Sequence, residues 1–228
     1  MENPLVVGYK GEIGSFILNG LLRVMPKAMN IWCVDVNETN KEVIERIQKS
    51  DVIFLCVPIF TTAGWLLKYK KHLKGKVIIE QCSLKGDLYD NKITKGLDIR
   101  GMHIMFRPSQ TPVSNDRNVG LILPHFTRAQ AIDIEKLTQS RVHWYNSVAQ
   151  HDEVMAKEQA LTHRVLLTLA LQLNGYTYVS RKVKDLAIRI SEGDLELYTA
   201  IQNNRQLPKM LKRFDKRLKT FDINNYMC

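Results

Sequence analysis

The sequence lacks a long hydrophobic run, a paired-cysteine motif, internal repeats and low-complexity tracts. No apolar stretch reaches the roughly 18–20 residues of a membrane-spanning helix, so no membrane association is expected. Residues 1–4 have neither the basic nor the apolar region of a signal peptide, which predicts a cytoplasmic protein. The four cysteines form no C-x-x-C pair, and Cys33, Cys56 and Cys82 lie in apolar runs. This pattern favours buried, reduced thiols over metal ligands or a nucleophile, and no metal is expected.

The sequence also lacks a concentrated block of charge, although its formal net charge is +10. The densest basic stretch, residues 209–219, alternates with Leu211, Phe214 and Leu218 at helical spacing. That spacing favours a solvated helix face over a nucleic-acid interface. The positive excess could also attract a small polyanionic substrate, and charge alone does not decide this. With 228 residues, 45% of them hydrophobic, the chain is long enough for one large or two small globular domains.

What the sequence does contain is a glycine turn between a short apolar run and an amphipathic stretch. Residues 5–7 predict a buried strand, and the apolar periodicity over 13–22 predicts a helix packed on a sheet. Such a turn brings the backbone close to a bound group and offers helical N–H groups to a phosphate. In the G-x-G-x-x-G dinucleotide register, Tyr9 stands where the first glycine belongs, so the pattern alone is equally typical of other βα turns. The predicted cofactor-binding residues here are Gly8, Tyr9, Gly11, Glu12, Ile13 and Gly14.

Polar or turn residues follow several other predicted strands. Asp35 comes about twenty residues after the glycines, where a Rossmann unit holds the adenosine ribose; the alternative is a solvated aspartate at a strand end. Its carboxylate would repel a ribose phosphate, which favours NAD over NADP. Because parallel strands end at one edge of a sheet, Val57, Pro58, Ser83 and His103 are expected to lie around the same ligand. Strands are predicted over 5–7, 31–34, 51–57, 77–82, 99–102, 119–123 and 142–145.

The character of the chain changes near residues 145–150. Beyond this point strand-like alternation disappears and the apolar residues take helical spacing. We therefore expect an N-terminal Rossmann-type parallel-sheet α/β domain over 1–147 and a small all-helical domain over 148–228. Its first helix is expected to be long and buried and to end at Asn174 and Gly175, and Gly193 and Asp194 are expected to separate the next two. Helices are predicted over 151–173, 183–190, 195–203 and 207–221.

Residues 101–109, G-M-H-I-M-F-R-P-S, resemble the G-x-H-P-M-F-G-P segment of the prephenate dehydrogenase family of tyrosine biosynthesis. Three residues depart from the family pattern. Tyr9 and Arg107 each replace a glycine, and Ile104 replaces the proline after the histidine. Tyr9 bears on the pyrophosphate geometry, whereas Arg107 adds a large cation beside the expected active site. The resemblance covers nearly the whole chain, through Val57-Pro58-Ile59, Ser83-Leu84-Lys85, His151-Asp152, residues 159–163, Arg189-Ile190, Asp194 and Leu197-Tyr198.

The resemblance implies NAD-dependent oxidative decarboxylation of prephenate to 4-hydroxyphenylpyruvate. It implies that His103 is the base at the substrate hydroxyl, since an imidazole titrates near neutral pH. Ser83 is expected to hydrogen-bond either this histidine or the substrate hydroxyl. Arg189 is expected to pair with a substrate carboxylate, and His163, one helical turn after Gln159, is expected to contact the substrate side chain together with Gln159. Lys85 and His151 also match the family but receive no role.

Three alternatives stay open from the sequence. The substrate could be arogenate, because no residue distinguishes an amine from a keto group. Another Rossmann-plus-helices reductase would share the architecture but would not require the segment at 101–109. The chain could also be a dinucleotide-binding relative without catalytic activity. The resemblance further implies a homodimer packed through the helical region, although the apolar residues there, Leu169, Leu173, Met210 and Phe214, could equally form an internal core.

Overall fold

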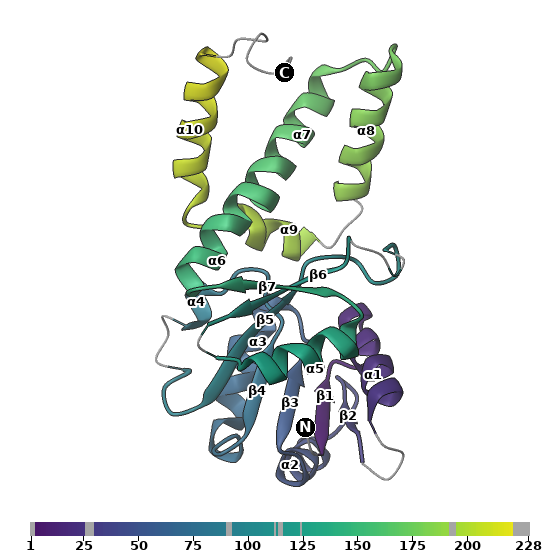
Figure 1. Cartoon of the computed structure of the whole chain (residues 1–228), viewed down its shortest axis with the longest axis vertical. Helices are drawn as coiled ribbons and strands as arrows, with labels where there is room; N and C mark the ends of the chain where they lie inside the picture. Colours follow the sequence, from purple (N-terminus) through teal and green to yellow (C-terminus); the bar gives the residue numbers. More distant parts are fainter. Residues whose placement is uncertain are drawn as a thin grey trace. The chain divides into compact units, whose positions relative to one another are not determined.

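The chain divides into two compact units, Met1–His151 and Asp152–Cys228 (Figure 1). The computed structural model describes residues 3–25, 30–89, 93–111, 113, 116–123, 125–191 and 195–220. Within these residues, the first unit contains a β-sheet with helices and the second unit contains helices alone. No helix in the described ranges combines the length and the apolar character needed to cross a membrane.

The first unit is built on a seven-stranded sheet in the order β2-β1-β3-β4-β5-β6-β7. All neighbouring strands are parallel except β5 and β6, which are antiparallel. The expected Rossmann-type α/β fold is confirmed, with the last two strands reversed. Because β1 to β5 run in one direction, their carboxyl ends share one edge. The strands are β1 (Pro4–Val7), β2 (Trp32–Val34), β3 (Val52–Leu55), β4 (Val77–Glu80), β5 (Asp98–Ile104), β6 (Asn118–Ile122) and β7 (Arg141–Tyr145).

Helices cover both faces of this sheet, because successive strand residues point to opposite faces. Leu5 and Val7 of β1 belong to a core cluster that includes residues of α2 and α3. Val6, between them, belongs to a second cluster that includes residues of α1 and α5. The helical elements of this unit are α1 (Glu12–Val24), α2 (Asn40–Lys49), α3 (Ile59–Tyr69), the 3₁₀ turn η1 (Lys70–His72), α4 (Gly86–Tyr89) and α5 (Arg128–Thr138).

Local sequence signals fix where two of these helices begin. The Thr39 hydroxyl accepts a hydrogen bond from the backbone N–H of Glu42, whose carboxylate accepts one from the N–H of Thr39. Thr127 and Gln130 form the same reciprocal pair at the start of α5. Each pair satisfies N–H groups that the first helical turn leaves open, which is why the chain turns into a helix at these points.

The helical region begins with α6 (Val148–Met155), which carries the chain from the first unit into the second. The helix continues through a π-helical segment, η2 (Ala156–Leu161), into α7 (Thr162–Gln172). The predicted helix over 151–173 is therefore present. The expectation that it is buried holds for its first half, where Met155, Ala156 and Ala160 are buried, and is wrong for α7, which has no buried residue. The remaining helices are α8 (Tyr178–Ser191), α9 (Leu195–Gln202) and α10 (Leu207–Lys219).

The helix predicted over 183–190 begins five residues earlier than expected. Thr177 and Ser180 explain this, because the N–H of each donates to the side-chain oxygen of the other at 3.0–3.1 Å. This reciprocal cap starts α8 at Tyr178. Gly193 and Asp194, predicted as the stop and cap between two helices, lie outside the described residues. The second unit has a small core cluster of Ala160, Ile201 and Leu207.

Candidate functional site

The glycine turn after β1 is a tight backbone cradle. Gly8 has a φ of +80°, which glycine adopts readily. A Cβ on Gly8 would lie 2.6 Å from the Cys56 carbonyl oxygen, and a Cβ on Gly14 would lie 2.0 Å from the Gly8 carbonyl oxygen. Tyr9 has no positive φ, so its replacement of the expected glycine costs no backbone strain. Gly11 is the N-cap residue of α1, and no side chain in the described part of the chain accepts a hydrogen bond from the first N–H groups of the helix. These N–H groups are therefore available to an anion.

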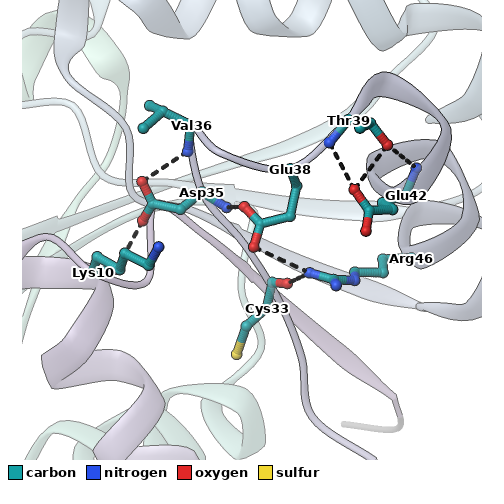
Figure 2. Close-up of polar contacts among 8 residues, drawn as sticks. All are labelled: Lys10, Cys33, Asp35, Val36, Glu38, Thr39, Glu42 and Arg46. Carbon is teal, nitrogen blue, oxygen red and sulfur yellow. Dashed lines mark hydrogen bonds and ion pairs between the residues drawn. The ribbon is translucent and has the colours of Figure 1, made fainter.

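Asp35 is fixed next to this turn (Figure 2). One oxygen of its carboxylate accepts a hydrogen bond from the backbone N–H of Lys10 at 2.9 Å, and the other accepts from the N–H of Val36 at 2.9 Å. The Asp35 backbone N–H donates to Glu38, whose carboxylate also lies 3.6 Å from the Arg46 guanidinium. A carboxylate can accept about four hydrogen bonds, so Asp35 keeps capacity for a diol. The glycine cradle and this carboxylate together fit the pyrophosphate and ribose of a dinucleotide.

Glu12, in the first turn of α1, is linked to the segment after β5. Its carboxylate accepts from the backbone N–H and the hydroxyl of Ser109 at 3.0 and 2.5 Å, and it lies 3.8 Å from the Arg107 guanidinium. Burial alone would raise the pKa of Glu12, but the bonds from Ser109 and the charge of Arg107 outweigh it and lower that pKa. The large cation that departs from the family pattern therefore has a counter-charge on α1.

Aromatic contacts hold the same segment against α1. Phe106 meets Phe16 of α1 edge to face, with ring centroids 5.5 Å apart. The Arg117 guanidinium lies 5.3 Å from the Phe106 centroid and 5.5 Å from that of Phe16. Arg117 also donates to the carbonyl oxygen of Thr111 at 2.6 and 2.9 Å. These contacts fix the segment that carries the sequence resemblance, and no local sequence signal indicates the part that Arg117 plays.

A fully buried ion pair lies between β4 and β5. The Lys85 ammonium is 2.6 Å from Glu80, and both side chains are 0% exposed. Glu80 also accepts from the Tyr89 hydroxyl at 3.2 Å and from the backbone N–H of Cys82 at 2.7 Å. Lys85 donates to the carbonyl oxygen of Met102 at 3.0 Å. Sequence reasoning left Lys85 without a role and missed Glu80, because a glutamate at the end of an apolar run has no helical or turn signature.

His103 belongs to β5 itself, which runs to Ile104 because β6 pairs with its end, whereas the sequence predicted a strand that stops at residue 102. The side chain is 2% exposed, and its Nδ1 lies 3.1 Å from Nε2 of His151 on α6. Burial first, and then the charges of His151 and Lys85, lower the pKa of His103 well below 6.5. A histidine in this environment is neutral at pH 7 and can accept a proton.

Ser83 and the residues after β3 complete the edge of the sheet. Ser83 lies in the turn after β4 and makes no hydrogen bond to His103 among the described residues, so its predicted contact with a substrate hydroxyl stays a prediction. Val57 packs on the first core cluster. Pro58 starts α3, and its carbonyl oxygen accepts from the Thr61 hydroxyl at 2.8 Å. The predicted cofactor contacts of Val57 and Pro58, like those of Ile13, stay predictions.

The second unit places two predicted residues in or beside the π-helical segment. Gln159 lies within it and has a buried side-chain oxygen without a hydrogen-bond partner in the described part of the chain. His163 has a buried, unpartnered Nδ1, and its ring is stacked on Tyr198 at 6.3 Å. Burial lowers the pKa of His163. Isolated π-helical turns are frequent at functional sites, and unpaired buried polar atoms need a ligand or water.

Arg189 lies in the last turn of α8 and is exposed. No hydrogen bond or ion pair involves its guanidinium within the described residues, and its predicted contact with a substrate carboxylate stays a prediction. Cys33, Cys56 and Cys82 are free cysteines, and burial raises the pKa of the Cys82 thiol to about 12. Cys228 lies outside the described residues. Across the described ranges, no group of three His, Cys, Asp or Glu side chains is placed to hold a metal ion.

The sheet order, the glycine cradle and the helical second unit define a Rossmann-type α/β fold followed by a helical unit. No protein-family model matches the sequence, and no curated protein matches it. The fold is similar to that of prephenate dehydrogenase from Aquifex aeolicus, with a TM-score of 0.71 and 20% identity over 96% of this chain and 90% of that one. A putative prephenate dehydrogenase from Corynebacterium glutamicum gives a TM-score of 0.69 and 18% identity, covering 95% of this chain and 80% of that one.

A pyrroline-5-carboxylate reductase from Coxiella burnetii is also similar, with a TM-score of 0.52 and 18% identity over 95% of this chain and 92% of that one. At these identities the likeness establishes the fold. The resemblance to prephenate dehydrogenases, inferred from short sequence segments, is thus confirmed at the level of the fold.

Proposed function

We propose that this chain is a dinucleotide-dependent oxidoreductase, and specifically an NAD-dependent dehydrogenase that oxidatively decarboxylates prephenate. One observation carries the proposal. Within one sheet, the glycine cradle follows β1, and the buried His103 lies at the same edge on β5. In open α/β sheets, ligands bind outside the carboxyl ends of the strands. The sequence segment around His103 and the fold of the two prephenate dehydrogenases support the choice of substrate.

The first unit offers suitable groups for the cofactor. NAD, when bound, would accept a hydride from the substrate. The cradle of Gly8, Gly11 and Gly14, with the open N–H groups of α1, would hold the pyrophosphate. Asp35 would accept hydrogen bonds from the adenosine ribose, and Glu38 adds a second carboxylate to the same loop (Figure 2). The charge of Glu38 is balanced by Arg46, whereas the Asp35 carboxylate would repel the extra phosphate of NADP, which favours NAD.

The proposed chemistry needs one group that accepts a proton and later returns it. Neutral His103 would take the proton from the substrate hydroxyl as the carbon bearing that hydroxyl loses its hydride. Loss of the ring carboxylate as CO2 then sends its bonding electrons into the ring. The ring becomes aromatic, and the oxygen takes the proton back from His103 as a phenol hydroxyl. Ser83 would hydrogen-bond the same oxygen.

The second unit supplies the proposed substrate-binding groups. Arg189 would hold a substrate carboxylate through two parallel hydrogen bonds. Gln159 and His163 would contact the side chain of the substrate, and each has a buried polar atom that lacks a partner in the described part of the chain. No described residue discriminates the keto group of prephenate from the amine of arogenate, so arogenate is the second substrate to test.

We also propose that two copies of the chain associate through the helical unit. Several large apolar side chains of α7, α8 and the loop between them are exposed, at 42% for Leu169, 84% for Leu171, 87% for Tyr176 and 69% for Val179. Exposed apolar area of this kind marks an interaction surface on many proteins. Met210, one of the apolar residues that the sequence left open between a contact with a second copy and an internal core, is 4% exposed and belongs to the inside of the unit.

The decisive experiment measures NADH formation by the purified chain with NAD and either prephenate or arogenate. We expect turnover with prephenate and weaker use of NADP than of NAD, and turnover with arogenate alone would make arogenate the substrate. His103→Ala should retain NADH binding but lose most of its turnover, whereas Arg189→Ala should chiefly raise KM for the substrate. A chain that binds NADH but turns over neither substrate would be a non-catalytic dinucleotide-binding protein, and a chain that does not bind NADH would overturn the proposal.

A further inference from the structure

We infer that His151 positions His103, by accepting a hydrogen bond from Nδ1–H of His103 so that Nε2 of His103 is left as the proton acceptor. The inference rests on the proposed function, because it concerns how the proposed base, His103, is oriented. Nδ1 of His103 and Nε2 of His151 are 3.1 Å apart, and the two side chains are 2% and 0% exposed. Both rings are shielded from water, so water does not supply an alternative hydrogen bond to either ring.

A hydrogen bond between two imidazole nitrogens carries one proton. If both nitrogens were protonated they would repel, and if neither were protonated the lone pairs would face each other without a bond. A neutral His103 ring has one N–H, so a proton on Nδ1 leaves the lone pair on Nε2. Only this tautomer is a base toward a substrate at Nε2. Its partner therefore decides whether His103 acts as a base or as a donor.

The position of His151 is itself well determined. Its ring meets the ring of Tyr145 at right angles, with centroids 5.1 Å apart, and its backbone N–H donates to the Ser147 carbonyl in the first turn of α6. Tyr145 in turn packs over Gly120 of β6, where a Cβ would come within 2.6 Å of the tyrosine ring. The Tyr145 hydroxyl donates to the sulfur of Met105 at 3.4 Å. The acceptor is thus held by contacts from β6, β7 and the segment after β5.

Charged groups beside the pair favour a single shared proton. Lys85 donates to the carbonyl of Met102, the residue before His103, and carries a positive charge that Glu80 balances at 2.6 Å. Other titratable side chains lie around these groups: Cys82 and Tyr89 next to Glu80, His125 stacked on Tyr89, and Tyr145 against His151. Burial raises the pKa of Tyr89 and of Cys82 and lowers the pKa of His125, so these three groups are uncharged at pH 7. A positive charge on the histidine pair would repel the charge of Lys85, and an added charge is costly in a buried setting.

The test compares three variants by turnover and by nitrogen NMR of the histidine rings. His151→Phe keeps a ring for Tyr145 but removes the acceptor, whereas His151→Gln provides a side-chain oxygen in its place. His143→Gln is the matched control, because His143 is exposed on β7 and bonds Asn118. We expect His151→Phe to lower kcat by about 10- to 100-fold, as loss of a group that orients a functional histidine does. KM for NAD should stay unchanged, His151→Gln should recover most of kcat, and His143→Gln should match the unmodified chain.

The NMR measurement separates this inference from the proposed function, because it needs no turnover. In the unmodified chain, the nitrogen shifts of His103 should show the proton on Nδ1; in His151→Phe they should show a mixture or the proton on Nε2. Finding the proton on Nε2 in the unmodified chain would overturn the inference even if the enzyme is active. An unchanged tautomer and kcat in His151→Phe would also overturn it. If that variant does not fold, the tautomer of the unmodified chain and the behaviour of His151→Gln still decide.

Discussion

The two units differ in the kinds of side chain that they bury. The sheet unit buries large aliphatic and aromatic side chains on both faces of the sheet, and it also encloses the Glu80–Lys85 pair and the two histidines. In the described part of the helical unit, half of the buried hydrophobic side chains are alanines (Ala156, Ala160, Ala187 and Ala200), while many of its large apolar side chains are exposed.

This difference indicates how each unit is stabilised. The core of the sheet unit surrounds its charged and neutral polar groups completely, which keeps their protonation states fixed. A buried charge is costly unless it is paired, and Lys85 is paired with Glu80. A helical unit with a thin core has little stability to spare by itself. Its stability should increase when it binds a second copy, or a ligand that hydrogen-bonds the unpaired polar atoms of Gln159 and His163.

The largest expected effect comes from breaking the buried pair. Lys85→Met leaves Glu80 charged and without its cation, which should lower the free energy of unfolding by about 3–5 kcal/mol. Lys85→Met with Glu80→Gln should recover much of this loss, because the amide oxygen can still accept from the backbone N–H of Cys82 while the amide NH2 faces the Tyr89 hydroxyl, which can accept from it. Urea unfolding followed by tryptophan fluorescence measures it, since Trp32, Trp65 and Trp144 all lie in the sheet unit. A double variant no more stable than the single one would contradict this account.

The next effect concerns the glycine cradle. Gly14→Ala places a Cβ against the carbonyl oxygen of Gly8, and we expect it to cost about 1–3 kcal/mol and to abolish dinucleotide binding. Gly64→Ala is the matched control, because Gly64 lies in α3 and a Cβ added there would have nothing within 4 Å. It should stabilise the chain by up to about 1 kcal/mol. Calorimetry and NADH fluorescence read both variants, and tight NADH binding by Gly14→Ala would show that the cradle does not hold the cofactor.

A pH dependence should follow from His103. Its pKa in the folded chain lies well below the ordinary value of 6.5, so between these two values the unfolded chain binds the extra proton and the folded chain does not. Stability should therefore fall as the pH drops below 6.5, by up to about 1.4 kcal/mol per pH unit for this group. Urea midpoints from pH 7.5 to pH 5.5 measure the slope. His103→Asn should flatten it, and an equal slope in that variant would assign the effect to other groups.

The smallest effect tests the exposed face of α7. Leu171→Ser should change the free energy of unfolding of a single chain by no more than about 0.5 kcal/mol, because the side chain is 84% exposed. Leu66→Ala, in the core of the sheet unit, should cost about 2–5 kcal/mol. Sedimentation at increasing concentration should show weaker self-association in Leu171→Ser. Unchanged association would place the contact between copies elsewhere, and a large loss of stability would mean that this face is covered within one chain.

Much of the molecule follows from local patterns. The order of strands and helices, the glycine cradle and the aspartate after β2 were all predictable, because a strand, a helix and a tight turn each have a short-range sequence signature. The same reasoning predicted a helix over 151–173 but could not tell how much of it is covered. Periodic apolar residues show that one face avoids water, and they do not show what lies against it.

Sequence alone determined the Rossmann-type order of elements and named His103 as the candidate base. Only the tertiary structure decided that His103 meets His151, that Lys85 is paired with Glu80 inside the sheet unit, and that Arg107 meets Glu12. The reason is physical. His103 and His151 are 48 residues apart, and their contact depends on the antiparallel pairing of β5 with β6 and on the path of the chain into α6. No short stretch of sequence encodes such a meeting.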